Sequence, residues 1–199
     1  MFYETATNAH GLPRDPFKAI MVPRPIGWIS SISADGKVNL APYSYFNAVG
    51  DNPHYVVFGS GGVKDSQANI EATKEFVCSL ATYALREAMN ATSASAARGV
   101  DEFELAGLEK AKSTLVVPPR VAASPVALEC TLHDIVRLPG ASGALDHYNM
   151  VIGKVLGIHI SDDVIVDGRV DVRKLRPIAR LGYMDYAVVD DFFSLERPA

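Results

Sequence analysis

The sequence predicts a mainly β fold, an antiparallel β-barrel with a few short helices packed over its ends or gaps. Apolar and polar residues alternate with a period of two in several short runs, and Gly, Pro, Asn or Asp bounds each run. Helical segments are few and short, whereas a doubly wound α/β sheet needs a helix of about ten or more residues after each strand. A closed antiparallel barrel is the most economical assembly of such strands.

We expect one ordered domain over residues 1–199. Hydrophobic residues make up 48% of the chain and charged residues 21%, which is close to ordinary globular usage. No shift in composition marks off a disordered half. A chain of 199 residues can also bury a sizeable core of its own.

The clearest strand is predicted at 126–138 (VALECTLHDIVRL), where Val126, Leu128 and Cys130 face one way and the residues between them face the other. Similar runs occur at 26–32, 38–46, 55–59, 75–82 and 149–160. The dipeptides Asp35-Gly36 and Asp167-Gly168 are typical of hairpins, because the central positions of a type I′ turn need positive φ. Six or more short strands with such turns predict a barrel or a sandwich.

Short helices are expected at 65–74, 84–91, 101–105 and 172–175. The first has Asp65 and Ser66 at its start and Lys74 at its end, as N-capping and the helix dipole favour. Residues 92–125 are the least regular part of the chain. We expect them to form a long excursion around the barrel that contacts a second subunit.

The charge pattern argues against nucleic acid and anionic membrane as partners. The net charge is −4 and the basic residues are scattered, whereas those partners select clustered Lys and Arg. The first residues lack a basic segment followed by an apolar stretch, and no apolar run approaches the ~20 residues of a membrane span. A cytoplasmic protein is therefore expected.

No metal site and no disulfide framework are expected. The histidines lack the close pairing of a metal motif, and each cysteine, Cys78 and Cys130, sits in an alternating apolar segment as a small hydrophobe would. Neither cysteine lies in a C-x-x-C or beside a histidine. Walker, Rossmann and nucleophile-elbow motifs are absent from the sequence as well.

The segment 60–66 (SGGVKDS) is the first that suits a ligand. Its glycines leave backbone N–H groups accessible before a helix start, and Lys64 and Ser66 offer a cation and a hydroxyl to an anion. The alternative is a plain strand-to-helix turn in which Asp65 caps the helix. The spacing alone favours the cap.

The second candidate is the pair of segments 24–30 (RPIGWIS) and 39–47 (NLAPYSYFN), joined by the Asp35-Gly36 hairpin. Small, hydroxyl, amide and aromatic residues on adjacent strands make a wall that stacks on a flat ring and bonds to its edge, as in a mainly apolar cofactor site. An aromatic-rich face of the barrel is the commoner outcome for such residues.

Taken together and in this order, these segments resemble the flavin reductase-like, FMN-binding split-barrel family. The resemblance runs through RPIGWIS, DGKVNLAPYSYFNAV, KDSQANIEATKEFVCSL, LREAMNATSA, VIGKVLGIHI and LRPIARLGYMDYAV, which together cover most of the chain. It implies a Greek-key split barrel, usually a homodimer, that holds FMN near the subunit interface.

The resemblance also implies roles for individual residues. The strand 24–30 and residues 43–47 should line the isoalloxazine and ribityl chain, with Ser44 and Asn47 as polar contacts, and the helix start should hold the phosphate, in place of the simple cap. A third group lies in a tail that returns toward the flavin. The implied cofactor-binding residues are Arg24, Pro25, Trp28, Ser30, Tyr43, Ser44, Tyr45, Phe46, Asn47, Lys64, Asp65, Ser66, Arg180, Tyr183 and Tyr186. Family members often carry a histidine before the strand at 151–155, and either His147 or Tyr148 is its match.

The implied function is that of an FMN-binding oxidoreductase that passes electrons from NAD(P)H to flavin, or through bound FMN to an acceptor such as a partner oxygenase or redox protein. Bound flavin carries such chemistry, so no catalytic side chain is assigned. Because a Rossmann motif is missing, weak NAD(P)H binding is expected. Two alternatives remain: a non-enzymatic FMN electron carrier that serves a partner reductase, and an oxygenase or oxidase acting on a small organic substrate.

Overall fold

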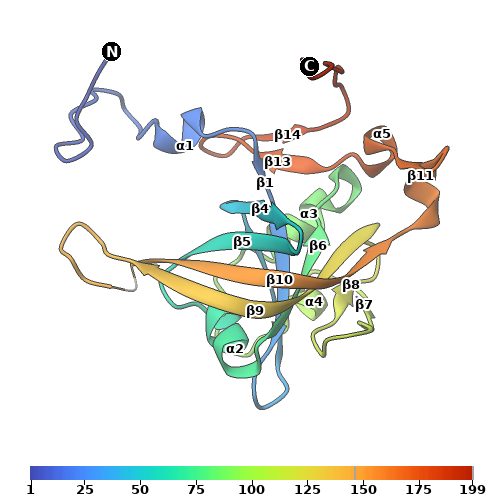
Figure 1. The fold of residues 1–199 in the computed structure, drawn as a ribbon. Helices are drawn as coiled ribbons and strands as arrows, with labels where there is room; N and C mark the ends of the chain where they lie inside the picture. Colours follow the sequence, from blue (N-terminus) through green and yellow to red (C-terminus); the bar gives the residue numbers. More distant parts are fainter. Residues whose placement is uncertain (146, 199) are drawn as a thin grey trace.

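The computed structural model describes residues 1–145 and 147–198, and seven antiparallel strands form its main sheet (Figure 1). The strand order is β3-β2-β6-β9-β10-β5-β4. These strands are β2 (Gly27–Ile32), β3 (Val38–Tyr43), β4 (Phe46–Asp51), β5 (His54–Gly61), β6 (Glu75–Leu80), β9 (Val126–Leu138) and β10 (Tyr148–Ile160). The sheet curls so that side chains of β3 and β5 meet across its interior.

Shorter elements cover the barrel and its ends. The helices and 3-10 turns are α1 (Phe17–Ile20), α2 (Asp65–Thr73), η1 (Tyr83–Leu85), α3 (Arg86–Ala91), α4 (Glu102–Leu105), η2 (Asp162–Val164) and α5 (Val172–Leu175). The remaining strands are β1 (Arg24–Pro25), β7 (Lys110–Ala111), β8 (Arg120–Val121), β11 (Ile165–Val166), β12 (Arg169–Val170), β13 (Ile178–Arg180) and β14 (Tyr186–Val188). No helix of the described part of the chain is long and apolar enough to cross a membrane.

One hydrophobic cluster fills the barrel interior. Tyr43 of β3 packs on Phe58 of β5 with ring centroids 4.6 Å apart, and Phe58 meets Phe76 of β6 edge to face at 5.9 Å. Both phenylalanines are fully buried, and Ile70 of α2 closes one end of the same cluster. Burial of such large side chains is the main source of stability for a fold of this kind.

A second cluster lies on the outer face of β2 and β3. Trp28 and Leu40 point outward from these strands and are covered by Met89 of α3, Phe103 of α4 and Ile178 of β13. Alternate residues of β2 therefore pack into different clusters, since Ile29 belongs to the barrel interior. This explains why the burial of β2 is nearly continuous along its length.

The N-terminal and C-terminal parts of the chain join in a separate three-stranded sheet of order β1-β13-β14 (Figure 1). Arg24 of β1 stabilises this junction. Its guanidinium donates to the backbone oxygens of Lys18 at 2.5 Å, Met21 at 2.7 Å and Leu181 at 2.8 Å. Both termini lie on this side of the barrel.

The structure confirms the mainly β antiparallel fold and most predicted elements, including 126–138 as β9. The predicted strand 38–46 is in fact two strands, because the chain turns between Tyr43 and Phe46. Both predicted hairpins form, but only Asp167-Gly168 has positive φ at both positions, 49° and 72°. The type I′ prediction for Asp35-Gly36 is wrong, since only Gly36 has positive φ there.

Candidate functional site

A cleft of about 450 Å³ opens beside the N-terminus of α2. Residues of β3, the β3–β4 turn, β5 and the segment after α3 form its walls. The lining includes Asn39, Tyr43, Ser44, Tyr45, Gly59, Gly61, Lys64, Asp65, Ser66, Thr92, Ser93, Ser95, Arg98 and Glu102. Aromatic and hydroxyl groups thus share this cleft with the start of a helix.

The start of α2 offers donors to an anion. Lys64 precedes the first helical residue in an extended conformation, and its side chain makes no capping hydrogen bond. The first N–H groups of the helix therefore have no side-chain cap, and the helix dipole adds partial positive charge there. Arg98 brings a second cation to the same cleft, with its Nε 3.9 Å from an Asp65 carboxylate oxygen. Asp65 is the first residue of α2 and does not cap it, so the cap interpretation is wrong.

A buried hydrogen-bond chain fixes the floor of the cleft. Glu102 accepts bonds from Asn39 Nδ2 at 3.0 Å and from the backbone N–H of Leu40 at 2.8 Å. Asn39 Oδ1 in turn accepts a bond from Ser66 Oγ at 2.8 Å. Because a carboxylate can only accept, it sets the direction of the chain, so the Ser66 hydroxyl donates to Asn39 and can still accept a bond.

Tyr43 places a hydroxyl at the inner wall of the cleft. The ring is buried, and its oxygen is buried without a hydrogen-bond partner among the described residues. Burial raises the pKa of the Tyr43 phenol, and the hydroxyls of Ser66 and Ser60 oppose this rise. Tyr43 thus remains a neutral donor, and a buried polar atom of this kind is usually satisfied in the working protein.

These features fit a flavin phosphate ligand. Free helix N–H groups and the two cations Lys64 and Arg98 suit a phosphate, as in other anion sites at helix N-termini. The unpartnered Tyr43 hydroxyl and the serines suit a polyhydroxyl chain, and Tyr45 adds an aromatic wall. The cleft therefore has the donor set and the size to bind an aromatic ring that carries a phosphate.

Six of the residues that the resemblance implies come together in this cleft: Tyr43, Ser44, Tyr45, Lys64, Asp65 and Ser66. The other implied residues of the two strand segments do not line the cleft. Phe46 packs against the barrel cluster, and Asn47 is exposed, where its side chain accepts a bond from the N–H of Ala48. Neither residue lines the cleft.

Trp28 and Ser30 lie behind the cleft wall. Trp28 is fully buried, and its indole Nε1 donates to Thr92 Oγ1 at 2.9 Å, which fixes one lining residue of the cleft. Ser30 is also buried and donates to the backbone oxygen of Pro119 at 2.5 Å. Neither residue lines the cleft, and Trp28 supports its wall from behind through Thr92.

Arg24 and Pro25 are in the strand that joins the N-terminal segment to β13. Three backbone oxygens already accept bonds from the Arg24 guanidinium, and the group lies 5.8 Å from the Tyr45 ring centroid. Arg24 therefore borders the cleft only through Tyr45. Pro25 is exposed and pairs with Ala179.

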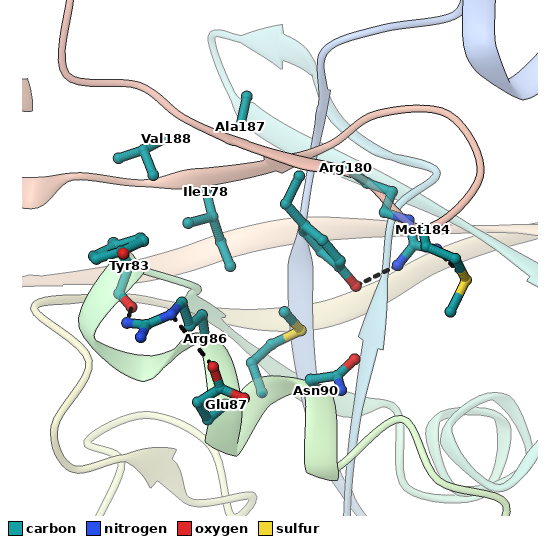
Figure 2. Close-up of a pocket in the computed structure, with 11 residues that line it drawn as sticks. Tyr83, Arg86, Glu87, Asn90, Ile178, Arg180, Met184, Ala187 and Val188 are labelled. Atoms are coloured by element: carbon teal, nitrogen blue, oxygen red, sulfur yellow. Dashed lines mark hydrogen bonds and ion pairs between the residues drawn. The ribbon is translucent and has the colours of Figure 1, made fainter.

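The tail residues gather around a second pocket (Figure 2). Arg180 and Tyr186 both line it, and the Arg180 guanidinium donates to the Tyr186 hydroxyl and to the backbone oxygen of Tyr183. The Tyr183 ring faces Arg14 instead, 5.4 Å from its guanidinium carbon. Within this chain the tail does not line the α2 cleft.

His147 lies next to the glycine-rich loop before α2. Its backbone oxygen accepts a bond from the N–H of Gly62 at 3.0 Å, and its ring meets Tyr148 edge to face at 4.9 Å. Tyr148 is opposite Gly61, which lines the cleft. Both candidates for the histidine position thus lie at the edge of the cleft without lining it.

The sequence reasoning missed the segment 92–98 as part of the site. Ser93, Ser95 and Arg98 line the cleft, yet they lie in the stretch predicted only as an irregular excursion. The signal was a run of hydroxyl residues followed by an arginine, after a predicted helix. The role of Glu102 was not predicted either. It depends on a hydrogen bond from the backbone N–H of Leu40 in β3, which is distant in the sequence.

Comparison with known proteins places the chain among flavin-related proteins. Nitrilotriacetate monooxygenase component B from Bacillus cereus is 29% identical, with a TM-score of 0.88 over 98% of each chain. The 2-nitrobenzoate 2-nitroreductase of Pseudomonas fluorescens is 26% identical, with a TM-score of 0.86 over 100% of this chain and 96% of that one.

The fold class has direct structural support as well. A split-barrel protein from Shewanella frigidimarina has a TM-score of 0.81 over 98% of this chain and 94% of its own, at 22% identity, which shows the fold alone. The split barrel implied by the resemblance is thereby confirmed. The family model of the flavin reductase like domain matches residues 20–176. The cleft at the start of α2 is therefore the candidate flavin site of a chain that belongs to the flavin reductase-like family.

Proposed function

We propose that this protein is an FMN-binding oxidoreductase that transfers electrons from NAD(P)H to flavin, or through bound FMN to an acceptor. One observation carries the proposal: a single cleft has groups suited to a phosphate at one end and groups suited to a flat ring at the other. Lys64, Arg98 and the N–H groups at the start of α2 suit a single phosphate, and Tyr45 adds an aromatic wall suited to a ring system. Family membership supports flavin as that ring system.

The chain's own residues bind and orient in this proposal. Flavin supplies hydride and electron transfer when it is bound, so a nucleophile or an acid–base pair is not needed. Lys64 and Arg98 hold the phosphate end, and Tyr43 donates its neutral hydroxyl inside the cleft. Ser66, fixed by Asn39, accepts a hydrogen bond from the ligand. Precise positioning is the contribution that a protein makes to such a transfer.

The electron donor is proposed to be a reduced nicotinamide that binds weakly. A Rossmann motif is missing from the sequence, so the nicotinamide has no dinucleotide domain to bind. For the acceptor we propose free flavin, oxygen or a partner oxygenase. The similarity to a protein described as a monooxygenase component supports the last of these.

We further propose a cytoplasmic homodimer. Residues 155–160 of β10 extend beyond the pairing with β5, and in the described ranges only β9 pairs with them. This free edge carries Leu156, Ile158 and Ile160, each more than 40% exposed. Such an edge favours pairing with another chain. Cys78 and Cys130 are not joined in a disulfide, which is compatible with a reducing compartment.

The proposal is tested by adding NADH or NADPH to protein loaded with FMN and following nicotinamide oxidation with free FMN, and then with oxygen, as acceptor. Sustained turnover by the purified protein supports the reductase. A protein that retains FMN and is reduced only after a partner reductase is added would instead be an electron carrier. Protein with Lys64→Ala serves as the matched control and should lose turnover at low FMN.

A further inference from the structure

A second pocket of about 320 Å³ lies between η1, α3 and the β13–β14 hairpin (Figure 2). It shares no lining residue with the α2 cleft. Asn90 of α3 lines this pocket, whereas Thr92, two residues further on, lines the cleft. The resemblance implies a cofactor role for Arg180 and Tyr186, but within this chain both line this pocket and neither lines the cleft. The size of the pocket falls within the range of small-molecule sites.

The base of the pocket is apolar. Met89 and Ile178 are 2% and 5% exposed and form its base, with Val188 beside them. The rings of Tyr83 and Tyr186 also belong to the lining. A flat apolar body therefore has both a buried surface and aromatic rings to contact.

The charge at the pocket is positive and incompletely paired. The Arg180 guanidinium donates to the Tyr186 hydroxyl, to the Tyr183 backbone oxygen at 2.5 Å and to the Met184 sulfur at 3.9 Å, and its carbon lies 4.5 Å from the Tyr186 ring centroid. All three partners are neutral, and no ion pair between described residues includes Arg180. Arg86, in contrast, has its charge offset by Glu87, with Nε 3.4 Å from the carboxylate.

We propose that this pocket binds a small aromatic carboxylate. The unpaired guanidinium of Arg180 selects an anion, and its planar donors match a carboxylate. The apolar base and the two tyrosines select a flat body of about the size of one ring. A polyphosphate fits poorly, because among the described residues Arg180 is the one lining cation without a carboxylate partner, and Glu87 adds a negative charge.

The test uses benzoate as the probe and benzamide as its uncharged isostere, with binding measured by calorimetry and by saturation-transfer NMR on the FMN-loaded protein. Benzoate should bind more tightly than benzamide. Arg180→Met should weaken benzoate by about tenfold and leave benzamide unchanged, since a charge-assisted contact is lost. Arg180→Lys should keep part of the preference for benzoate.

Two controls keep the result specific. Arg169→Met removes a positive charge on β12, outside the pocket, and should leave benzoate binding unchanged. Ala187→Trp fills the pocket from β14 and should abolish binding of both probes even if Arg180→Met fails to fold. Equal binding of the two probes, or benzoate binding that Ala187→Trp leaves intact, would overturn the proposal. Competition between benzoate and FMN would place the probe in the cleft and overturn it as well.

Discussion

Two cations at the start of α2 decide how the proposed cofactor is held. Lys64 and Arg98 reach the cleft from different segments, and the helix dipole acts in the same direction. Asp65 lies close to Arg98 and offsets part of its charge. Lys64 therefore contributes the less compensated charge of the pair.

Lys64→Ala and Arg98→Ala should each loosen FMN. A charge-assisted contact contributes about 1.5–3 kcal/mol, so each change should raise the Kd by one to two decades. Titration of FMN fluorescence measures this, with Arg86→Ala as a control that removes a cation outside the cleft. FMN affinity that is unchanged in both cleft variants would place the phosphate elsewhere.

Glu129 is a buried carboxylate that holds the segment after β7. It accepts bonds from the backbone N–H groups of Thr114 at 2.7 Å, Leu115 at 2.5 Å and Val116 at 3.2 Å, and from His159 Nε2. Burial opposes its ionisation, but the bonds from His159, Thr114 and Leu115 outweigh burial and hold the pKa of Glu129 below its usual range. The charged form is thus the one that the fold stabilises.

This depressed pKa predicts a loss of stability in acid. The contribution of Glu129 is complete above its pKa in the unfolded chain, roughly 4.3, and is lost as the pH falls through the lower folded value. Glu129→Gln should lower the free energy of unfolding at pH 7 by about 1–3 kcal/mol, because backbone donors lose acceptors. The difference from wild type should shrink below about pH 4. Urea unfolding at several pH values measures it, and a difference independent of pH would contradict this account.

The strands were predictable because the alternation of apolar and polar residues that indicates a strand lies within the strand itself. Alternation within 126–138 specifies β9 without knowledge of its neighbours. The segment 92–125 has no such pattern, because distant residues fix it: Ser30 holds Pro119, and Glu129 holds residues 114–116. The same reason hid Arg98 and Glu102, whose roles depend on the approach of this segment to β3 and α2.

Gly153 of β10 lies against the ring of Phe76 of β6 inside the barrel. A Cβ added to Gly153 would lie 2.2 Å from the Phe76 ring, which is fully buried and has no room to move. Gly153→Ala should therefore destabilise the protein by about 1–3 kcal/mol through overpacking. Chemical denaturation measures the change.

Gly157→Ala, on the same strand, is the matched control. Its added Cβ would meet the exposed Leu115 side chain at 3.1 Å, and Leu115 can move aside. Equal losses of stability in the two variants would show that Phe76 does not set the spacing of these strands.

For the whole molecule, the free edge of β10 bears on the oligomeric state. Leu156 and Ile158 are exposed. In the described part of the chain, only β9 pairs with this stretch of β10, so its other edge is open. Ile158→Lys should therefore shift the proposed dimer toward monomer in sedimentation velocity, because a charge on a paired edge opposes association. Lys154→Arg, where β5 still pairs, should leave the mass unchanged. A wild-type protein that sediments as a monomer at all concentrations would contradict the dimer.

The fold and one half of the cleft could be predicted from the sequence, through the resemblance of ordered motifs. The resemblance also implied that the tail approaches the flavin, but in this chain Arg180 and Tyr186 line another pocket. Where the tail of one subunit lies relative to the cleft of another depends on assembly, and no local pattern encodes it. Trp28 shows the same limit, since its motif fixed its strand but not the face on which it points.

We propose that the α2 cleft binds FMN and that a reduced nicotinamide reduces the flavin there. The most direct measurement is the visible absorbance of the FMN-loaded protein under anaerobic conditions before and after addition of NADH, repeated with NADPH. We expect the oxidised flavin bands to bleach with at least one nicotinamide, and Lys64→Ala to lose the bound flavin at the same FMN concentration. A protein that takes up no FMN, or flavin bands that persist with both nicotinamides, would contradict the account.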